Sequence, residues 1–122
     1  DVLIIDTPPA IVDEMKLASR TSDVSIVVTT AAKTSILDAK RCIKALALMN
    51  VPPIGVVVNM PYYKYGDKLL PLFVGKDGVP EEILGVPVLA VIPFNGFELS
   101  LLDRVGEQIL KYVEKREEGD EA

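Results

Sequence analysis

The chain opens with Asp1-Val2-Leu3-Ile4-Ile5-Asp6-Thr7-Pro8-Pro9-Ala10, and residues 2–5 of this stretch indicate the fold. Four consecutive apolar residues do not alternate between a core and water, so they predict a strand buried on both faces, as in the centre of a parallel sheet. The strand ends in the acid Asp6, and a carboxylate in that position requires a reason. It can serve a ligand, or it can cap the next turn or pair with a nearby cation.

Apolar strands and amphipathic helices continue to alternate along the chain. This alternation predicts an α/β fold, a mostly parallel sheet with flanking helices and right-handed crossovers. Besides residues 2–5, we expect strands over 24–28, 54–58 and 86–92, and helices over 13–20, 35–50 and 97–116.

The second and third expected helices each show one apolar face. Ser35-Ile36-Leu37-Asp38 resembles a capping box and predicts the start of the second helix. Cys42 lies beside the apolar stripe of that helix, so we interpret it as a small core residue rather than a reactive thiol. The two stripes comprise Ile36, Ala39, Ile43 and Leu46 in the second helix, and Leu102, Val105, Ile109 and Val113 in the third.

Residues 60–82 lack clear periodicity, which is unusual inside a compact domain and predicts a functional loop or a small hairpin. A strand within this stretch is possible over 69–74. Tyr62, Tyr63 and Tyr65 either form a surface for a partner or pack locally.

Composition limits the class of protein. Hydrophobic residues make up 49% of the chain and charged residues 25%, which is typical of a globular domain. The net charge of −5 gives no broad electrostatic case for nucleic acid or an anionic membrane. The single Cys excludes an internal disulfide, and the absence of His excludes His-based catalysis and His-ligated zinc. With no long apolar run and no visible signal peptide, we expect a cytoplasmic protein.

Polar or turn-forming residues follow each expected strand. Ligands of parallel α/β sheets bind beyond the carboxyl ends of the strands, so we expect these groups to meet at one edge. An acid held there by a stiff strand suits Mg²⁺, which prefers few carboxylates and several waters. The set comprises residues 6–9, Thr29-Thr30, Asn59-Met60-Pro61 and Pro93-Phe94-Asn95.

Several of these stretches together resemble the Mrp/ApbC-type ATPases, relatives of the MinD and ParA proteins in the deviant P-loop class. The resemblance runs in one order from residue 4 to about Asn95, and is therefore more specific than any single motif. It rests on IIDTPPA (4–10) with Asp13-Glu14, IVVTT (26–30) with ILD (36–38), NVPPIGVVVNMPYY (50–63), FVGKDG (73–78), LGVP (84–87) and IPFN (92–95).

The resemblance implies a site for Mg-ATP. Asp6 is then the catalytic Walker B acid, holding Mg²⁺ through a water, and the segment from Thr7 and Pro8 to Ala10 senses the γ-phosphate. Asn59 hydrogen-bonds the adenine edge. Pro93, Phe94 and Asn95 line the base from the other side. The resemblance further implies a homodimer or other oligomer, in which the nucleotide controls the holding of an iron–sulfur cluster and its delivery to apoproteins.

The sequence departs from the family pattern in three places. No Gly-rich loop with Lys-Ser/Thr occurs, and Gly75-Lys76-Asp77-Gly78 lacks the required spacing. No CxxC pair follows Asn59, which weakens the case for a bound iron–sulfur cluster, and Ala10 replaces a glycine. We therefore interpret residues 1–116 as the C-terminal part of a single P-loop ATPase domain and 117–122 as an acidic tail. Alone, the chain is expected not to hydrolyse ATP.

Other functions fit parts of the pattern. A MinD/ParA-like partitioning ATPase or a non-catalytic α/β interaction module is an alternative. A receiver-like phosphoacceptor domain fits less well, because Asn59-Met60-Pro61 stands where that fold needs a lysine. The apolar strand over 2–5 would present an open edge without a neighbouring strand, so we also expect oligomerisation.

Overall fold

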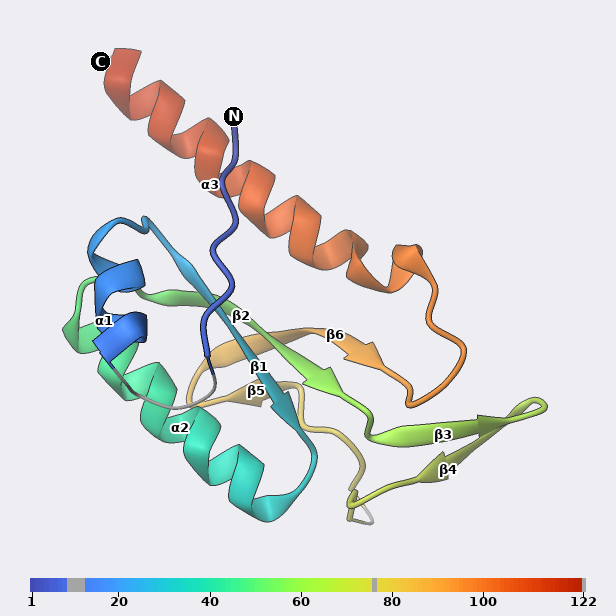
Figure 1. The fold of residues 1–122 in the computed structure, drawn as a ribbon. Helices are drawn as coiled ribbons and strands as arrows, with labels where there is room; N and C mark the ends of the chain where they lie inside the picture. Colours follow the sequence, from blue (N-terminus) through green and yellow to red (C-terminus); the bar gives the residue numbers. More distant parts are fainter. Residues whose placement is uncertain (9–12, 76, 122) are drawn as a thin grey trace.

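The computed structural model describes residues 1–8, 13–75 and 77–121 of the chain. From residue 13 on, its helices and strands alternate as the sequence predicts, with additional short strands, whereas the strand predicted over residues 2–5 is not formed (Figure 1). In order they are α1 (Asp13–Arg20), β1 (Ser25–Thr30), α2 (Lys33–Leu48), β2 (Pro53–Asn59), β3 (Tyr62–Tyr65), β4 (Lys68–Pro71), β5 (Glu82–Ile83), β6 (Val86–Ile92), the 3-10 helix η1 (Leu99–Leu102) and α3 (Asp103–Glu121).

The main sheet has the strand order β1-β2-β6-β5. The pairs β1–β2 and β2–β6 are parallel, and the short β5 pairs antiparallel with β6. This arrangement confirms the expected α/β fold with a mostly parallel sheet. β3 and β4 form a separate antiparallel hairpin, which extends away from the sheet in Figure 1.

α2 and α3 lie on either side of the sheet (Figure 1). The predicted stripe of α2 is confirmed, because Ala39, Ile43 and Leu46 are buried and Ile36 packs against them. They meet the fully buried Val56 and Val58 of β2. Cys42 is partly buried against the same cluster, as a core residue should be.

α3 begins later and ends later than predicted. Glu98 is extended and precedes η1, so regular α-helix starts only at Asp103. α3 continues through Glu121, and the expected tail over 117–122 is therefore helical as far as that residue. The Arg104 guanidinium donates a hydrogen bond to the Val88 carbonyl at 3.2 Å, and Arg116 forms an ion pair with Asp23. The stripe from Leu102 to Val113 is half-buried.

The predicted strand over residues 2–5 is wrong. Residues 1–8 form no regular secondary structure, and the side chains of Leu3 and Ile4 are 85% and 80% exposed. A parallel strand exists only where a neighbour accepts and donates its backbone hydrogen bonds, and β1 pairs only with β2 among the described residues. Apolar composition predicted the strand, but no strand among the described residues pairs with it.

The predicted capping box is also wrong. α2 begins two residues earlier, at Lys33, and its N-cap residue Ala32 provides no side-chain hydrogen bond. The Thr30 hydroxyl instead lies 2.7 Å from the Ser35 hydroxyl and donates to it. β1 runs on to Thr30, so the chain turns directly from strand to helix and Ser35 lies inside the first turn.

The irregular stretch over 60–82 contains the β3–β4 hairpin, which confirms the hairpin alternative. The strand suggested for 69–74 is β4, which begins at Lys68 and already ends at Pro71. The two-residue strand β5 was not predicted. Within the described residues, no helix has both the length and the apolar character needed to cross a membrane.

Candidate functional site

Three of the four expected strand ends meet at one edge of the sheet. Thr30 of β1 pairs with Asn59 of β2, and Asn59 pairs in turn with Ile92 of β6. The three strands therefore end at the same level, and Pro93 follows directly. In parallel α/β sheets this carboxyl edge is the usual place for a ligand.

Asn59 has a free carboxamide at this edge. It is half-buried, and its side chain forms no hydrogen bond with any residue that the structure describes. The next residue, Met60, has a φ of 60°, which turns the chain sharply away from the sheet. Asn59 thus offers one acceptor and two N–H donors to an incoming group.

Asn95 is placed differently, because its carboxamide bonds to the β3–β4 hairpin. We call the hydrogen bonds that join this hairpin to residues 92–95 the clasp. Its Oδ1 accepts a hydrogen bond from the Lys64 amide at 2.6 Å, and its Nδ2 donates to the Lys64 carbonyl at 2.7 Å. Two backbone bonds of 2.7 Å add to this clasp, from Met60 N–H to the Ile92 carbonyl and from Phe94 N–H to the Tyr62 carbonyl.

Aromatic side chains gather where the clasp joins the hairpin. The rings of Tyr63 and Phe94 lie 6.0 Å apart at 34°. Phe94 remains 59% exposed and Tyr65 71% exposed. Local packing of the hairpin tyrosines is thus observed for Tyr63, whereas Tyr65 presents its ring to solvent.

The structure does not place the residues predicted for the phosphate side in the sheet. Asp6, Thr7 and Pro8 are exposed and lie outside any strand. Pro9 and Ala10, the rest of the expected sensing segment, lie outside the described residues. Their roles stay predictions.

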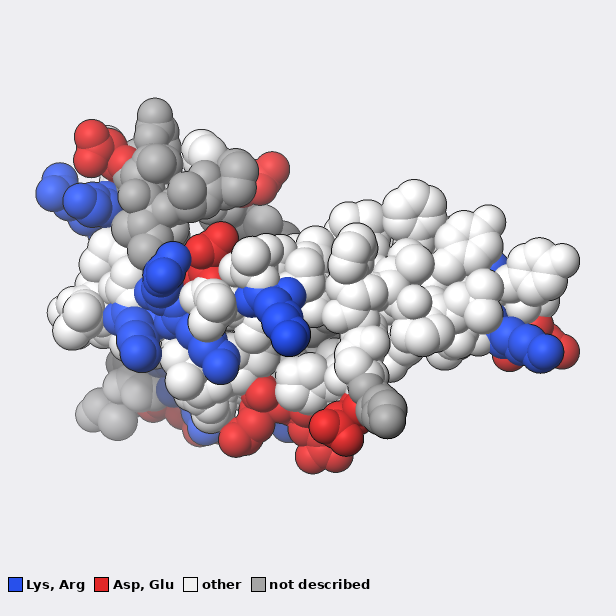
Figure 2. Space-filling model, turned by 90° about the horizontal axis from the view of Figure 1, so that it is seen from below, with Lys and Arg blue, Asp and Glu red and all other residues white. Residues whose placement is uncertain are grey.

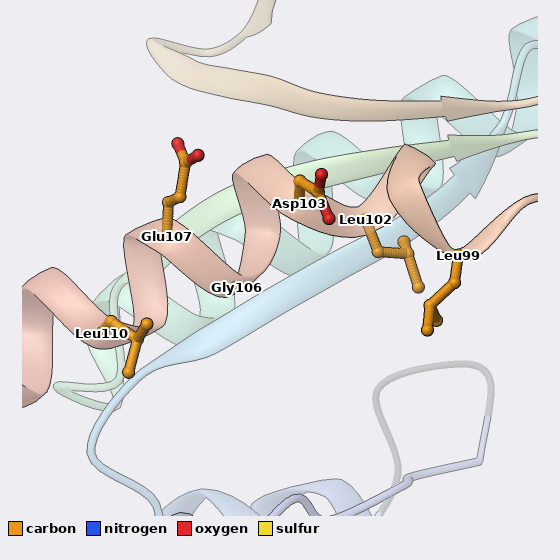
Figure 3. Close-up of a pocket in the computed structure, with 6 residues that line it drawn as sticks. All are labelled: Leu99, Leu102, Asp103, Gly106, Glu107 and Leu110. Carbon is orange, nitrogen blue, oxygen red and sulfur yellow. The ribbon is translucent and has the colours of Figure 1, made fainter.

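Two hollows lie near these elements. A small apolar hollow of about 180 Å³ lies at the carboxyl edge and is lined in part by the segment after β4. The second, of about 360 Å³, lies along α3, where Leu99, Leu102 and Leu110 point to one side of the helix and Glu107 points away (Figure 3). The first is lined by Ala31, Ile36, Val58, Phe73, Val74, Gly75, Gly78, Val79 and Pro80.

Among the described residues, neither a shifted pKa nor a cluster of metal-binding side chains marks the carboxyl edge of the sheet. Burial raises the pKa of the Cys42 thiol above its ordinary value, which favours the unreactive neutral form. Within residues 1–8, 13–75 and 77–121, no group of three or more His, Cys, Asp or Glu side chains is arranged to hold a metal ion.

The clasp is the feature that sequence reasoning missed. Asn95 was expected to face a base, yet both of its polar groups bond to a residue 31 positions away. An Asn side chain can replace a strand neighbour because it carries the same acceptor and donor as a peptide group. Nothing in the local sequence identifies so distant a partner.

Comparisons with known proteins agree with the fold. A family model described as "ParA: NUBPL iron-transfer P-loop NTPase" matches residues 1–121. An iron-sulfur cluster carrier protein of Methanocaldococcus jannaschii is 33% identical over 95% of this chain and 45% of its own length. A cytosolic Fe-S cluster assembly factor NUBP1 homolog of Brugia malayi is 30% identical over 92% of this chain and 40% of its own length. The chain thus spans less than half the length of these relatives.

Proposed function

Because this chain belongs to the family of ParA-type NUBPL iron-transfer P-loop NTPases, we propose that it forms the base-binding part of the nucleotide site of an iron–sulfur cluster carrier. The observation that carries the proposal is the free carboxamide of Asn59 at the shared end of three parallel strands. The receiver-domain alternative is set aside, because the family match covers residues 1–121.

Asn59 suits adenine chemically. Its N–H donates to a ring nitrogen while its oxygen accepts from the exocyclic amine, the same pairing by which Asn reads adenine elsewhere. Pro93 and the exposed ring of Phe94 would supply apolar contact for the base. Asn95 supports this arrangement from behind, by holding the hairpin against the segment that contacts the base.

Mg-ATP, when bound, would supply a triphosphate whose charge the metal partly neutralises. Asp6 is the residue proposed to hold Mg²⁺ through water, in a state where residues 2–5 have joined a sheet and brought the carboxylate to the edge. No Gly-rich phosphate loop occurs in the 122 residues, so no other residue of the chain is assigned to the phosphates. We therefore expect no ATP hydrolysis above background by this chain alone.

The proposed cargo follows from the names of the relatives, and the proposed partners and oligomeric state follow from the family resemblance of the sequence. We propose that the whole protein carries an iron–sulfur cluster as its substrate, delivers it to apoproteins and works as a dimer or larger oligomer. The described residues contribute no cluster ligands to this proposal, and they support only the nucleotide part of the function.

Titration of nucleosides tests the proposal. We expect adenosine and ATP without Mg²⁺ to bind this chain with similar affinity, measured by calorimetry, because without the metal the proposed contacts reach only the base. Asn59→Ala should weaken adenosine binding about tenfold through loss of two hydrogen bonds. Asn59→Asp should shift preference toward guanosine, since a carboxylate accepts from the two N–H groups of guanine and cannot donate to adenine.

The control is Gln108→Glu, which makes the same change of amide to acid on α3, away from the edge. It should leave both affinities unchanged. Equal loss in the Asn59 and Gln108 variants, or adenosine binding that is indifferent to residue 59, would contradict a base site at Asn59.

A further inference from the structure

The outward face of α2 carries an unusual concentration of positive charge for an acidic chain. Apart from one adjacent pair, its residues follow one another at separations of three or four, which places them on one side of a helix. The same side contains two exposed leucines, Leu37 at 53% and Leu48 at 85%. This α2 basic face, as we name it, comprises Lys33, Leu37, Lys40, Arg41, Lys44 and Leu48.

The charges on this face are largely uncompensated. Within the described residues, the face has one ion pair, between Arg41 and Asp38 at 3.3 Å, and both side chains are about three-quarters exposed. A pair so exposed contributes little free energy and leaves the local potential positive. Figure 2, which views the molecule from the side on which α2 lies, shows Lys and Arg gathered there.

The stability of α2 does not explain this arrangement. The first turn of α2 contains no acidic residue, its N-cap lacks a side-chain hydrogen bond, and Lys33 is its first residue. A cation at that end opposes the helix dipole and lowers the stability of the helix. The opposite face of α2 packs into the core. Leu37 and Leu48 lie on the outward face and are exposed, so they contribute nothing to that packing.

We propose that the α2 basic face docks an acidic amphipathic helix of a partner protein. Carboxylates of that helix would pair with Lys40, Arg41 and Lys44. Leu37 and Leu48, about three helical turns or ~16 Å apart, would contact two apolar residues of matching spacing. No residue of this surface is assigned to the nucleotide site, so the proposal stands without the proposed function.

Charge favours a protein segment over an anionic lipid surface. The whole chain carries −5, and an extended anionic membrane would repel its acidic remainder. A short helix feels mainly the local patch, because salt screens charges beyond roughly 8 Å. Two leucines on one helix also give little apolar area for insertion into a bilayer.

The probe is a fluorescent helical peptide with glutamates on one face and two leucines spaced like Leu37 and Leu48, titrated with the full chain at physiological salt. We expect saturable binding that weakens about tenfold in the double variant Lys40→Glu, Lys44→Glu. The matched control Lys111→Glu, Lys115→Glu makes the same charge change on exposed positions of α3 and should preserve the affinity within about twofold. Circular dichroism verifies that each variant is folded.

Variants of Leu37 and Leu48 distinguish specific docking of the peptide from non-specific attraction between opposite charges. Leu37→Ala with Leu48→Ala should weaken binding about fivefold, and a peptide with glutamine in place of its leucines should lose as much. Equal losses in the α2 and α3 charge variants would overturn the proposal, as would undiminished binding of the glutamine peptide. It would also fail if vesicles of phosphatidylserine and phosphatidylcholine bound through α2 while the peptide did not bind.

Discussion

The two faces of the central sheet are covered to very different extents, although both are apolar. On β1, Val27 faces α2 and is 5% exposed, whereas the adjacent Val28 faces the other side and is 66% exposed. α2 packs over β1 and β2, while α3 packs mainly over β2 and β6. Burial at this sheet therefore depends on which helix reaches which strand, and not on the apolar character of the strand alone.

The largest effect should come from this pair of valines. Val27→Ala removes two methyl groups from a filled core and should lower the free energy of unfolding by about 2 to 3 kcal/mol. Val28→Ala makes the same chemical change at an exposed position and should alter it by less than about 0.5 kcal/mol. Urea denaturation of both variants measures the difference, and similar losses would show that β1 is covered on both faces.

A smaller effect should separate the hairpin from the body of the domain. Asn95→Ala removes both side-chain bonds to Lys64 and should weaken the clasp by about 1 kcal/mol, without changing the burial of the sheet. The Lys64 amide should then exchange with deuterium about fivefold faster, as measured by NMR, while amides of β2 keep their protection. Unchanged exchange at Lys64 would mean that the backbone bonds alone hold the hairpin.

The smallest effect concerns the thiol on the covered face. Burial raises the pKa of Cys42, so the folded state retains the thiol proton more strongly than the unfolded state does. The resulting stabilisation is complete below the pKa of the unfolded thiol and is lost as the pH rises through the higher pKa of the folded thiol. Denaturation curves at alkaline pH should show this loss in the native chain and less of it in Cys42→Ala.

Local pattern was sufficient where each segment packs on a neighbour that the chain provides. The helical stripe at Ala39, Ile43 and Leu46, and the strands over 54–58 and 86–92, lie where periodicity predicted them. Pattern failed for residues 2–5, where apolar content predicted a strand and no strand in the described part of the chain pairs with it. It failed again at Ser35, because the preceding strand, rather than the capping motif, set the start of α2.

The candidate site divides in the same way. The sequence predicted that the strand ends at Asn59 and before Pro93 lie at one edge of the sheet, and the pairing of Asn59 with Ile92 confirms it. It also predicted that Asn95 lines a base, which stays a prediction, while the structure shows both polar groups of that side chain bonded to Lys64 of the hairpin. A strand end is fixed by local apolar runs and the parallel topology, whereas the partner of one side chain depends on distant segments meeting.

The amino-acid sequence by itself determined the α/β class, the family and the order of β1, α2, β2, β6 and α3, because these depend on short-range periodicity and on motifs in a fixed order. Periodicity also predicted the buried stripe of α2, whereas only the tertiary structure decided how exposed each strand residue is and which polar side chains are free or bonded. The basic face of α2, the open face at Val28 and the contrast between Asn59 and Asn95 all arise from how helices and hairpin pack on the sheet. Packing joins residues far apart in the chain, and such contacts leave no trace in local periodicity.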